Sequence, residues 1–153
     1  MTARLRKLKW FTKILRKMEV LYIDDDLEDV EIFREELYEI DPAIRFCYAV
    51  SADDAFKKLT GNLIRPDVIF MDYHMPVVDG HECIKVIKER NALKNIPIVL
   101  VSTSINSKQV DEFNKLGVYY FLSKSALAID MKPAIKVILN SLCKGEVRNS
   151  TTG

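Results

Sequence analysis

The sequence contains few cysteines and no long run of apolar residues. Its three cysteines, Cys47, Cys83 and Cys143, show neither the spacing of a metal site nor a paired framework. This argues against a disulfide scaffold and favours a reducing cytosol. No apolar segment is long enough to span a bilayer, and the N-terminus lacks the apolar stretch and cleavage site of a secretory signal. We therefore expect a cytoplasmic protein.

Acidic residues are absent from the first 18 positions. Seven of the 23 basic residues lie there, and all 22 acidic residues follow, so the remainder carries a net charge of −6. A mildly acidic body argues against nucleic-acid binding. The chain has 153 residues, 48% of them hydrophobic and 29% charged, which predicts one ordinary globular domain with a full core.

Residues 1–18 place apolar side chains at helical spacing with Lys and Arg between them. One interpretation is an amphipathic helix that contacts an anionic membrane surface or an acidic partner. We favour two alternatives, that translation begins at Met18 or that this stretch is a loosely docked extension. Residues 19–143 are then expected to form the domain. Residues 144–153 are expected to be a polar tail with no second domain after it.

Five short apolar runs alternate with segments of helical periodicity. The runs lie at 20–23, 44–50, 67–71, 96–101 and 118–122. They are rich in β-branched and aromatic residues and mostly do not alternate, which is typical of strands buried on both faces. Ser51 is a predicted helix N-cap, Gly117 a C-cap residue, and Pro133 suits a first turn. The βα pattern, repeated five times, predicts an α/β fold with a doubly wound, five-stranded parallel sheet.

Polar residues follow four of the five predicted strands. They are Asp24, Asp25 and Asp26 after the first, Asp72 after the third, Ser102 after the fourth and Lys124 after the fifth. Taken singly, each has a simple explanation as a helix cap, a turn, a loop hydroxyl or a surface charge. In open α/β sheets, however, ligands bind outside the carboxyl ends of the strands. Four such ends together predict one site.

The predicted site would bring Asp24, Asp25 and Asp72 to one edge of the sheet. Crowded carboxylates raise at least one pKa unless a cation lies among them, and Mg²⁺ suits oxygen ligands. With Lys124 and Ser102 opposite the acids, the site suits the stabilisation of a transferring phosphoryl group. Asp72 would then be the nucleophile that forms an acyl phosphate.

These residues, in this order, resemble the receiver domain of two-component response regulators over about residues 19–143. The stretch "DYHMPVVDG" at 72–80 is similar to the D-x-x-M-P-x-x-D-G loop of that family. The resemblance implies a flavodoxin-like (βα)5 fold. It also implies a stand-alone phosphorelay protein that takes a phosphoryl group from a sensor histidine kinase or phosphotransfer protein. Such a protein catalyses only its own phosphorylation and dephosphorylation and is not a metabolic enzyme.

The resemblance also implies the roles of the site residues. Asp72 would accept the phosphoryl group. Asp25, Asp72 and the backbone carbonyl of His74 would bind Mg²⁺ directly, and Asp24 would assist through water. Lys124 would pair with the phosphoryl oxygens.

The family's switch residues correspond here to Ser102 and Phe121. Ser102 would move inward to hydrogen-bond the phosphate, and Phe121 would follow. The surface formed by the last two helices and the strand between them would then change its affinity for a downstream protein. His74 and Ser104 flank the phosphoryl group in the family, and our hypothesis is that they tune the rate of dephosphorylation.

One departure from the family follows Lys124, where Ser125 replaces the usual proline. This leaves the family's cis peptide bond in doubt, since a non-proline cis bond costs about 3–4 kcal/mol. The Ser-Thr-Ser stretch at 102–104 and the Lys-Ser pair are similar to small single-domain regulators that partner phytochrome-like kinases. That likeness implies a homodimer through the face formed by residues 107–143.

Two alternatives remain open from the sequence alone. The stretch "VLYIDDDLED" at 20–29 also fits a haloacid-dehalogenase-like phosphatase, with Asp24 as nucleophile and Asp26 as acid/base. That family needs a further acidic pair after the lysine, where only Asp130 occurs, and it leaves Asp72 unexplained. The second alternative is a degenerate receiver that takes no phosphate and acts as a pure interaction module.

Overall fold

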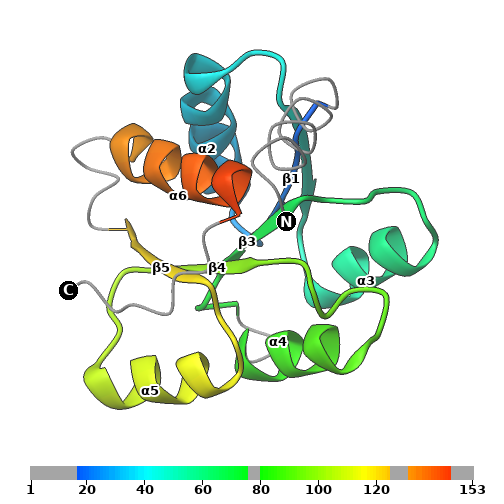
Figure 1. Cartoon of the computed structure of the whole chain (residues 1–153), viewed down its shortest axis with the longest axis vertical. Helices are drawn as coiled ribbons and strands as arrows, with labels where there is room; N and C mark the ends of the chain where they lie inside the picture. Colours follow the sequence, from blue (N-terminus) through cyan, green and yellow to red (C-terminus); the bar gives the residue numbers. More distant parts are fainter. Residues whose placement is uncertain (1–16, 76–79, 125–130, 146–153) are drawn as a thin grey trace, which may run out of the picture.

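In the part of the chain that the structure describes, five strands and five helices alternate (Figure 1). The computed structural model describes residues 17–75, 80–124 and 131–145. The strands are β1 (Glu19–Ile23), β2 (Arg45–Ala49), β3 (Val68–Asp72), β4 (Ile98–Ser102) and β5 (Tyr120–Ser123). The helices are α2 (Leu27–Ile40), α3 (Ala52–Thr60), α4 (Gly80–Glu89), α5 (Ser107–Lys115) and α6 (Lys132–Lys144).

All strands are parallel, in the order β2-β1-β3-β4-β5. This confirms the predicted doubly wound sheet with flavodoxin-like topology. From β1 the chain goes first to β2 on one side and then to β3 on the other. The strand order therefore reverses between β1 and β3, and sheets of this kind bind ligands beside such a reversal.

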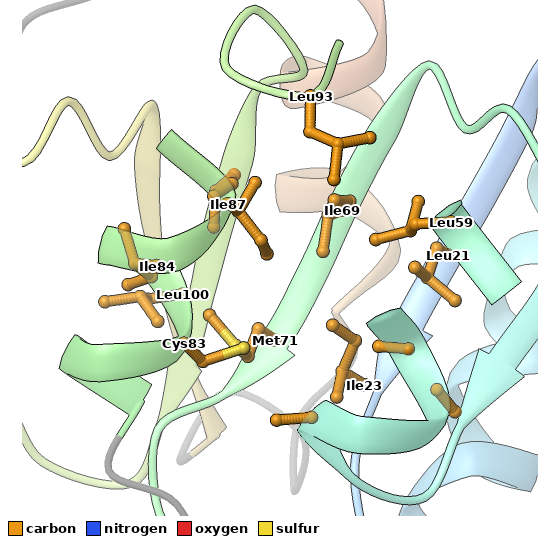
Figure 2. Close-up of a cluster of buried hydrophobic side chains, with 14 of the residues drawn as sticks. Leu21, Ile23, Leu59, Ile69, Met71, Cys83, Ile84, Ile87, Leu93 and Leu100 are labelled. Carbon is orange, nitrogen blue, oxygen red and sulfur yellow. The ribbon is translucent and has the colours of Figure 1, made fainter. Parts of the chain in front are cut away.

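Helices cover both faces of the sheet, with α2 and α6 on one face and α3, α4 and α5 on the other (Figure 1). Successive strand residues point to opposite faces. On β1, Leu21 and Ile23 join the core beneath α3 and α4 (Figure 2), whereas Val20 and Tyr22 join the core beneath α2 and α6. Because both sets are buried, the strands read as continuous apolar runs and not as alternating ones.

The residues predicted to begin or end helices do so in the structure. The Ser51 hydroxyl accepts a hydrogen bond from the Asp54 amide at 3.1 Å and caps α3. Gly117 follows α5 with a positive φ of 79°, a backbone conformation that glycine adopts without strain. Pro133 lies in the first turn of α6. The fourth strand begins two residues later than its apolar run, at Ile98, after Pro97, which has no N–H to donate to the ladder.

The three cysteines are free. Cys83 is a buried residue of α4 that packs in the core, and burial raises the pKa of its thiol to about 11. It is therefore a small apolar core residue.

Several predictions concern residues outside the described ranges. They are the extension at 1–16, the Lys124–Ser125 peptide, Asp130 and the tail at 146–153. The domain boundaries accordingly stay predictions. Within the described ranges, no helix combines the length and apolar character needed to cross a membrane.

Candidate functional site

The polar strand ends meet at one edge of the sheet, as the sequence predicts. Asp72 is the last residue of β3, and Asp24 and Asp25 follow the neighbouring strand β1. Ser102 ends β4 on the other side of β3, and Lys124 follows β5. Parallel strands deliver these side chains together because their carboxyl ends lie along the same edge.

Three carboxylates form a cluster at this edge. Asp24, Asp25 and Asp72 each offer an oxygen, and the three atoms lie within 4.8 Å of one another. Asp24 and Asp72 are buried, with exposures of 0% and 4%, while Asp25 is exposed. Oxygen ligands on opposite sides of one Mg²⁺ ion lie about 4 Å apart, so the cluster fits a hard divalent cation.

Burial raises the pKa of Asp24 above its usual value, although hydrogen bonds and Lys124 oppose this. The Tyr22 hydroxyl donates to Asp24 Oδ2 at 2.7 Å, and the Asp26 amide donates to Oδ1 at 2.9 Å. Burial and the charge of Asp24 raise the pKa of Tyr22 in turn, so its hydroxyl stays protonated as a donor. The Tyr22 ring stacks on Phe33 of α2, with centroids 4.4 Å apart. The site is thereby connected to the core.

Lys124 is surrounded by acids. Its Nζ lies 3.2 Å from Asp24 Oδ2, 3.3 Å from Asp72 Oδ1 and 2.7 Å from Asp29 Oδ2. Burial alone would lower the pKa of Lys124, but the hydrogen bond to Asp29 and the charges of Asp24 and Asp72 outweigh burial and raise it. The side chain is therefore a fixed ammonium close to the Asp72 carboxylate.

Asp29 and Tyr22 are site residues that the sequence did not reveal. An acid in the first turn of a helix is explained by the helix dipole, and Asp29 lies in the first turn of α2. A tyrosine in a buried strand likewise reads as a core residue. Neither position carries a sequence signal that marks a contact with Lys124 or Asp24.

The Ser102 hydroxyl is engaged within its own loop. It donates to the Ser104 carbonyl at 3.0 Å, accepts from the Ser104 amide at 3.3 Å and lies 3.3 Å from Nε2 of His74. The His74 amide donates to Asp72 Oδ1 at 3.2 Å. The His74 side chain and backbone thus each reach a site residue, while Ser104 contacts Ser102 through its backbone.

An aromatic cluster connects the end of β3 to α5 and β5. Tyr73 packs edge-on against Phe113 at 5.3 Å between centroids, and Phe113 packs against Phe121 at 6.2 Å. The Gln109 amide donates to the Tyr73 hydroxyl at 3.0 Å. Phe121, the predicted switch residue, therefore contacts Phe113 of α5. Phe113 in turn contacts Tyr73, the residue that follows Asp72.

Residues 20–136 match the family described as the response regulator receiver domain, and the chain belongs to this family. It is thus a receiver domain of two-component signalling, a phosphoacceptor module and not a metabolic enzyme. This overturns the phosphatase alternative. The structure gives Asp26 a different task, because its side chain caps α2 by accepting from the Glu28 amide at 2.9 Å.

Two plant relatives are also two-component response regulators. The two-component response regulator ARR5 of Arabidopsis thaliana is 29% identical over 140 residues, covering 86% of this chain and 73% of ARR5. ARR3 from the same plant is 28% identical over 123 residues, 76% of this chain and 53% of ARR3. This chain therefore spans about half the length of ARR3.

Solved structures with the same fold include two cyanobacterial-type regulators. The phosphorylated cyanobacterial phytochrome response regulator RcpA superposes with a TM-score of 0.75 at 26% identity, covering 88% of this chain and all of RcpA (100%). The Mn²⁺-bound response regulator Rcp1 gives a TM-score of 0.66 at 26% identity, covering 89% of this chain and 99% of Rcp1. The predicted likeness to phytochrome-partner regulators is confirmed.

We expect Asp24→Asn to stabilise the protein without added metal. The folded-state pKa of Asp24 lies above the ordinary value of 3.8, so ionisation of this group destabilises the fold. That destabilisation is absent below the ordinary pKa and grows as the pH rises through the folded-state pKa. At pH 7 in EDTA, urea unfolding should show that the free energy of unfolding of Asp24→Asn exceeds that of the wild type. The difference should be larger than the roughly 0.5 kcal/mol of typical surface substitutions.

The gain from Asp24→Asn should shrink as the pH is lowered toward 4. Glu35→Gln, at an exposed position of α2, removes the same charge away from the site and should stay within the surface range. An equal gain in the free energy of unfolding for both variants, or a loss for Asp24→Asn, would contradict the claim that ionised Asp24 destabilises the fold.

Proposed function

We propose that Asp72 accepts a phosphoryl group from a sensor histidine kinase or phosphotransfer protein. The observation that carries the proposal is the placement of Asp72, which is 4% exposed at the end of a central strand and 3.3 Å from the Lys124 ammonium. Membership of the receiver family supports it. So does RcpA, whose structure was solved in phosphorylated form.

The chemical step is a displacement at phosphorus. A carboxylate oxygen of Asp72 attacks the phosphorus of a phosphohistidine, the new P–O bond forms, and the P–N bond breaks as the imidazole leaves with its electron pair. The Lys124 ammonium lies where it would neutralise charge on the phosphoryl oxygens. Burial of Asp72 keeps competing water from surrounding the carboxylate.

Mg²⁺ is the cofactor that the carboxylate cluster fits. Asp25, Asp72 and the His74 carbonyl would hold the ion directly, and Asp24 would act through water. The ion would offset the negative charge that gathers between the cluster and the phosphoryl oxygens. The three oxygens within 4.8 Å support this assignment, as does the related Rcp1, which was solved with Mn²⁺.

Phosphorylation would be read out at the face formed by α5, β5 and α6. The Ser102 hydroxyl would exchange its bond to the Ser104 carbonyl, now 3.0 Å long, for a phosphoryl oxygen. Phe121 would follow and disturb its packing against Phe113. The face would then bind a downstream protein, or a second copy of the chain, with altered affinity.

Phosphorylation by acetyl phosphate and Mg²⁺ tests the proposed acceptor. Intact mass measurement should detect one labile phosphoryl adduct on the wild type, none on Asp72→Asn, and none when EDTA removes the metal. An adduct that persists on Asp72→Asn would move the acceptor to another acid. No adduct on the wild type would favour the pure interaction module.

His74→Asn should shorten the half-life of the acyl phosphate. The His74 ring lies 3.3 Å from the Ser102 hydroxyl and its amide contacts Asp72, so the ring would shield the phosphoryl group from water. The smaller asparagine opens this side, and we expect a roughly two- to tenfold faster loss of the adduct. His81→Asn changes the other histidine, which packs against Phe113, and serves as the control. Equal half-lives for His74→Asn and wild type would refute the shielding role.

A further inference from the structure

Among the described residues, Lys124 has three carboxylate partners, and the closest of them lies outside the carboxylate cluster. Its Nζ lies 2.7 Å from Asp29 Oδ2, compared with 3.2 Å to Asp24 and 3.3 Å to Asp72. A lysine ammonium has three N–H donors, so these acceptors can account for all of them. The direction of the ammonium group is therefore set jointly by β1, β3 and α2.

Two of these partners change their electrostatic role when the site works. Asp72 is the proposed acceptor, so its carboxylate becomes an acyl phosphate. Asp24 belongs to the carboxylate cluster that fits a cation. Asp29 takes part in neither, so its contact with Lys124 can persist before and after phosphorylation.

The start of α2, which carries Asp29, is also well fixed. It lies in the first turn of α2, where the Asp26 side chain accepts from the Glu28 amide and the Val30 amide donates to the Asp26 carbonyl at 3.1 Å. Phe33 is fully buried one turn later and packs between Tyr22 and Phe70. The helix start that carries Asp29 is thus fixed by its cap and by the core.

We propose that Asp29 is a positioning residue that anchors the Lys124 ammonium toward the phosphoryl group. The inference rests on the proposed phosphorylation of Asp72. Side-chain exposures of 11% for Lys124 and 25% for Asp29 shield the pair from water more than most surface ion pairs. A charge-assisted hydrogen bond in such a setting holds its geometry better than an exposed one.

The test is the second-order rate constant of phosphorylation by acetyl phosphate, measured by intact mass at saturating Mg²⁺. Asp29→Asn should be about three- to tenfold slower than wild type, because the ammonium loses its closest charged partner. Glu28→Gln removes the same charge from the neighbouring, exposed position and should be no slower. Equal rates for Asp29→Asn and Glu28→Gln would overturn the inference while leaving the proposed function intact.

A Lys124→Ala background separates positioning from a merely structural role. There, adding Asp29→Asn should cause no further slowing, since the group that it positions is gone. Equal slowing in both backgrounds would show that Asp29 supports the fold and does not act through Lys124. Thermal unfolding midpoints check that each variant folds, and Asp29→Ser replaces Asp29→Asn if the latter does not. A wild type that takes no phosphate would instead refute the proposed function, and this inference with it.

Discussion

Four carboxylates crowd together where β1 and β3 end and α2 begins. Asp24, Asp29 and Asp72 contact the ammonium of Lys124, and Asp25 lies with Asp24 and Asp72 in the carboxylate cluster. One positive charge does not balance four negative charges, and burial of Asp24 and Asp72 makes the imbalance more unfavourable. The surrounding fold holds these carboxylates together, and a divalent cation beside the Lys124 ammonium would relieve their repulsion.

The fold holds the carboxylates in place because the strands that carry them are buried on both faces of the sheet. β3 lies between β1 and β4, with helices above and below, so Asp72 projects from a strand that has no freedom to move aside. The Tyr22 hydroxyl joins the core to the Asp24 carboxylate. Rigid support of this kind fixes reacting groups more accurately than a loop does. The same burial would carry a change at Ser102 and Phe121 toward α5, because packed rings have few alternative arrangements.

The sequence predicted the fold and the centre of the site for one reason. Parallel strands end at a common edge, so the residues after each apolar run must come together, and Asp24, Asp25, Asp72, Ser102 and Lys124 do so. What the sequence could not predict depends on how helices and rings are oriented. Asp29 reaches Lys124 only because α2 starts directly after the cluster. Gln109 meets Tyr73 only because α5 presents that side to the end of β3.

Cation binding at the carboxylate cluster can be measured as the midpoint of thermal unfolding against Mg²⁺ concentration at constant ionic strength. If the carboxylate cluster is built around a cation, Mg²⁺ should raise the wild-type midpoint by mass action until the site saturates. The midpoint of Asp25→Asn should rise only at far higher Mg²⁺. A wild-type midpoint that does not respond to Mg²⁺, or an identical response in both proteins, would show that the carboxylate cluster is not a site for this cation.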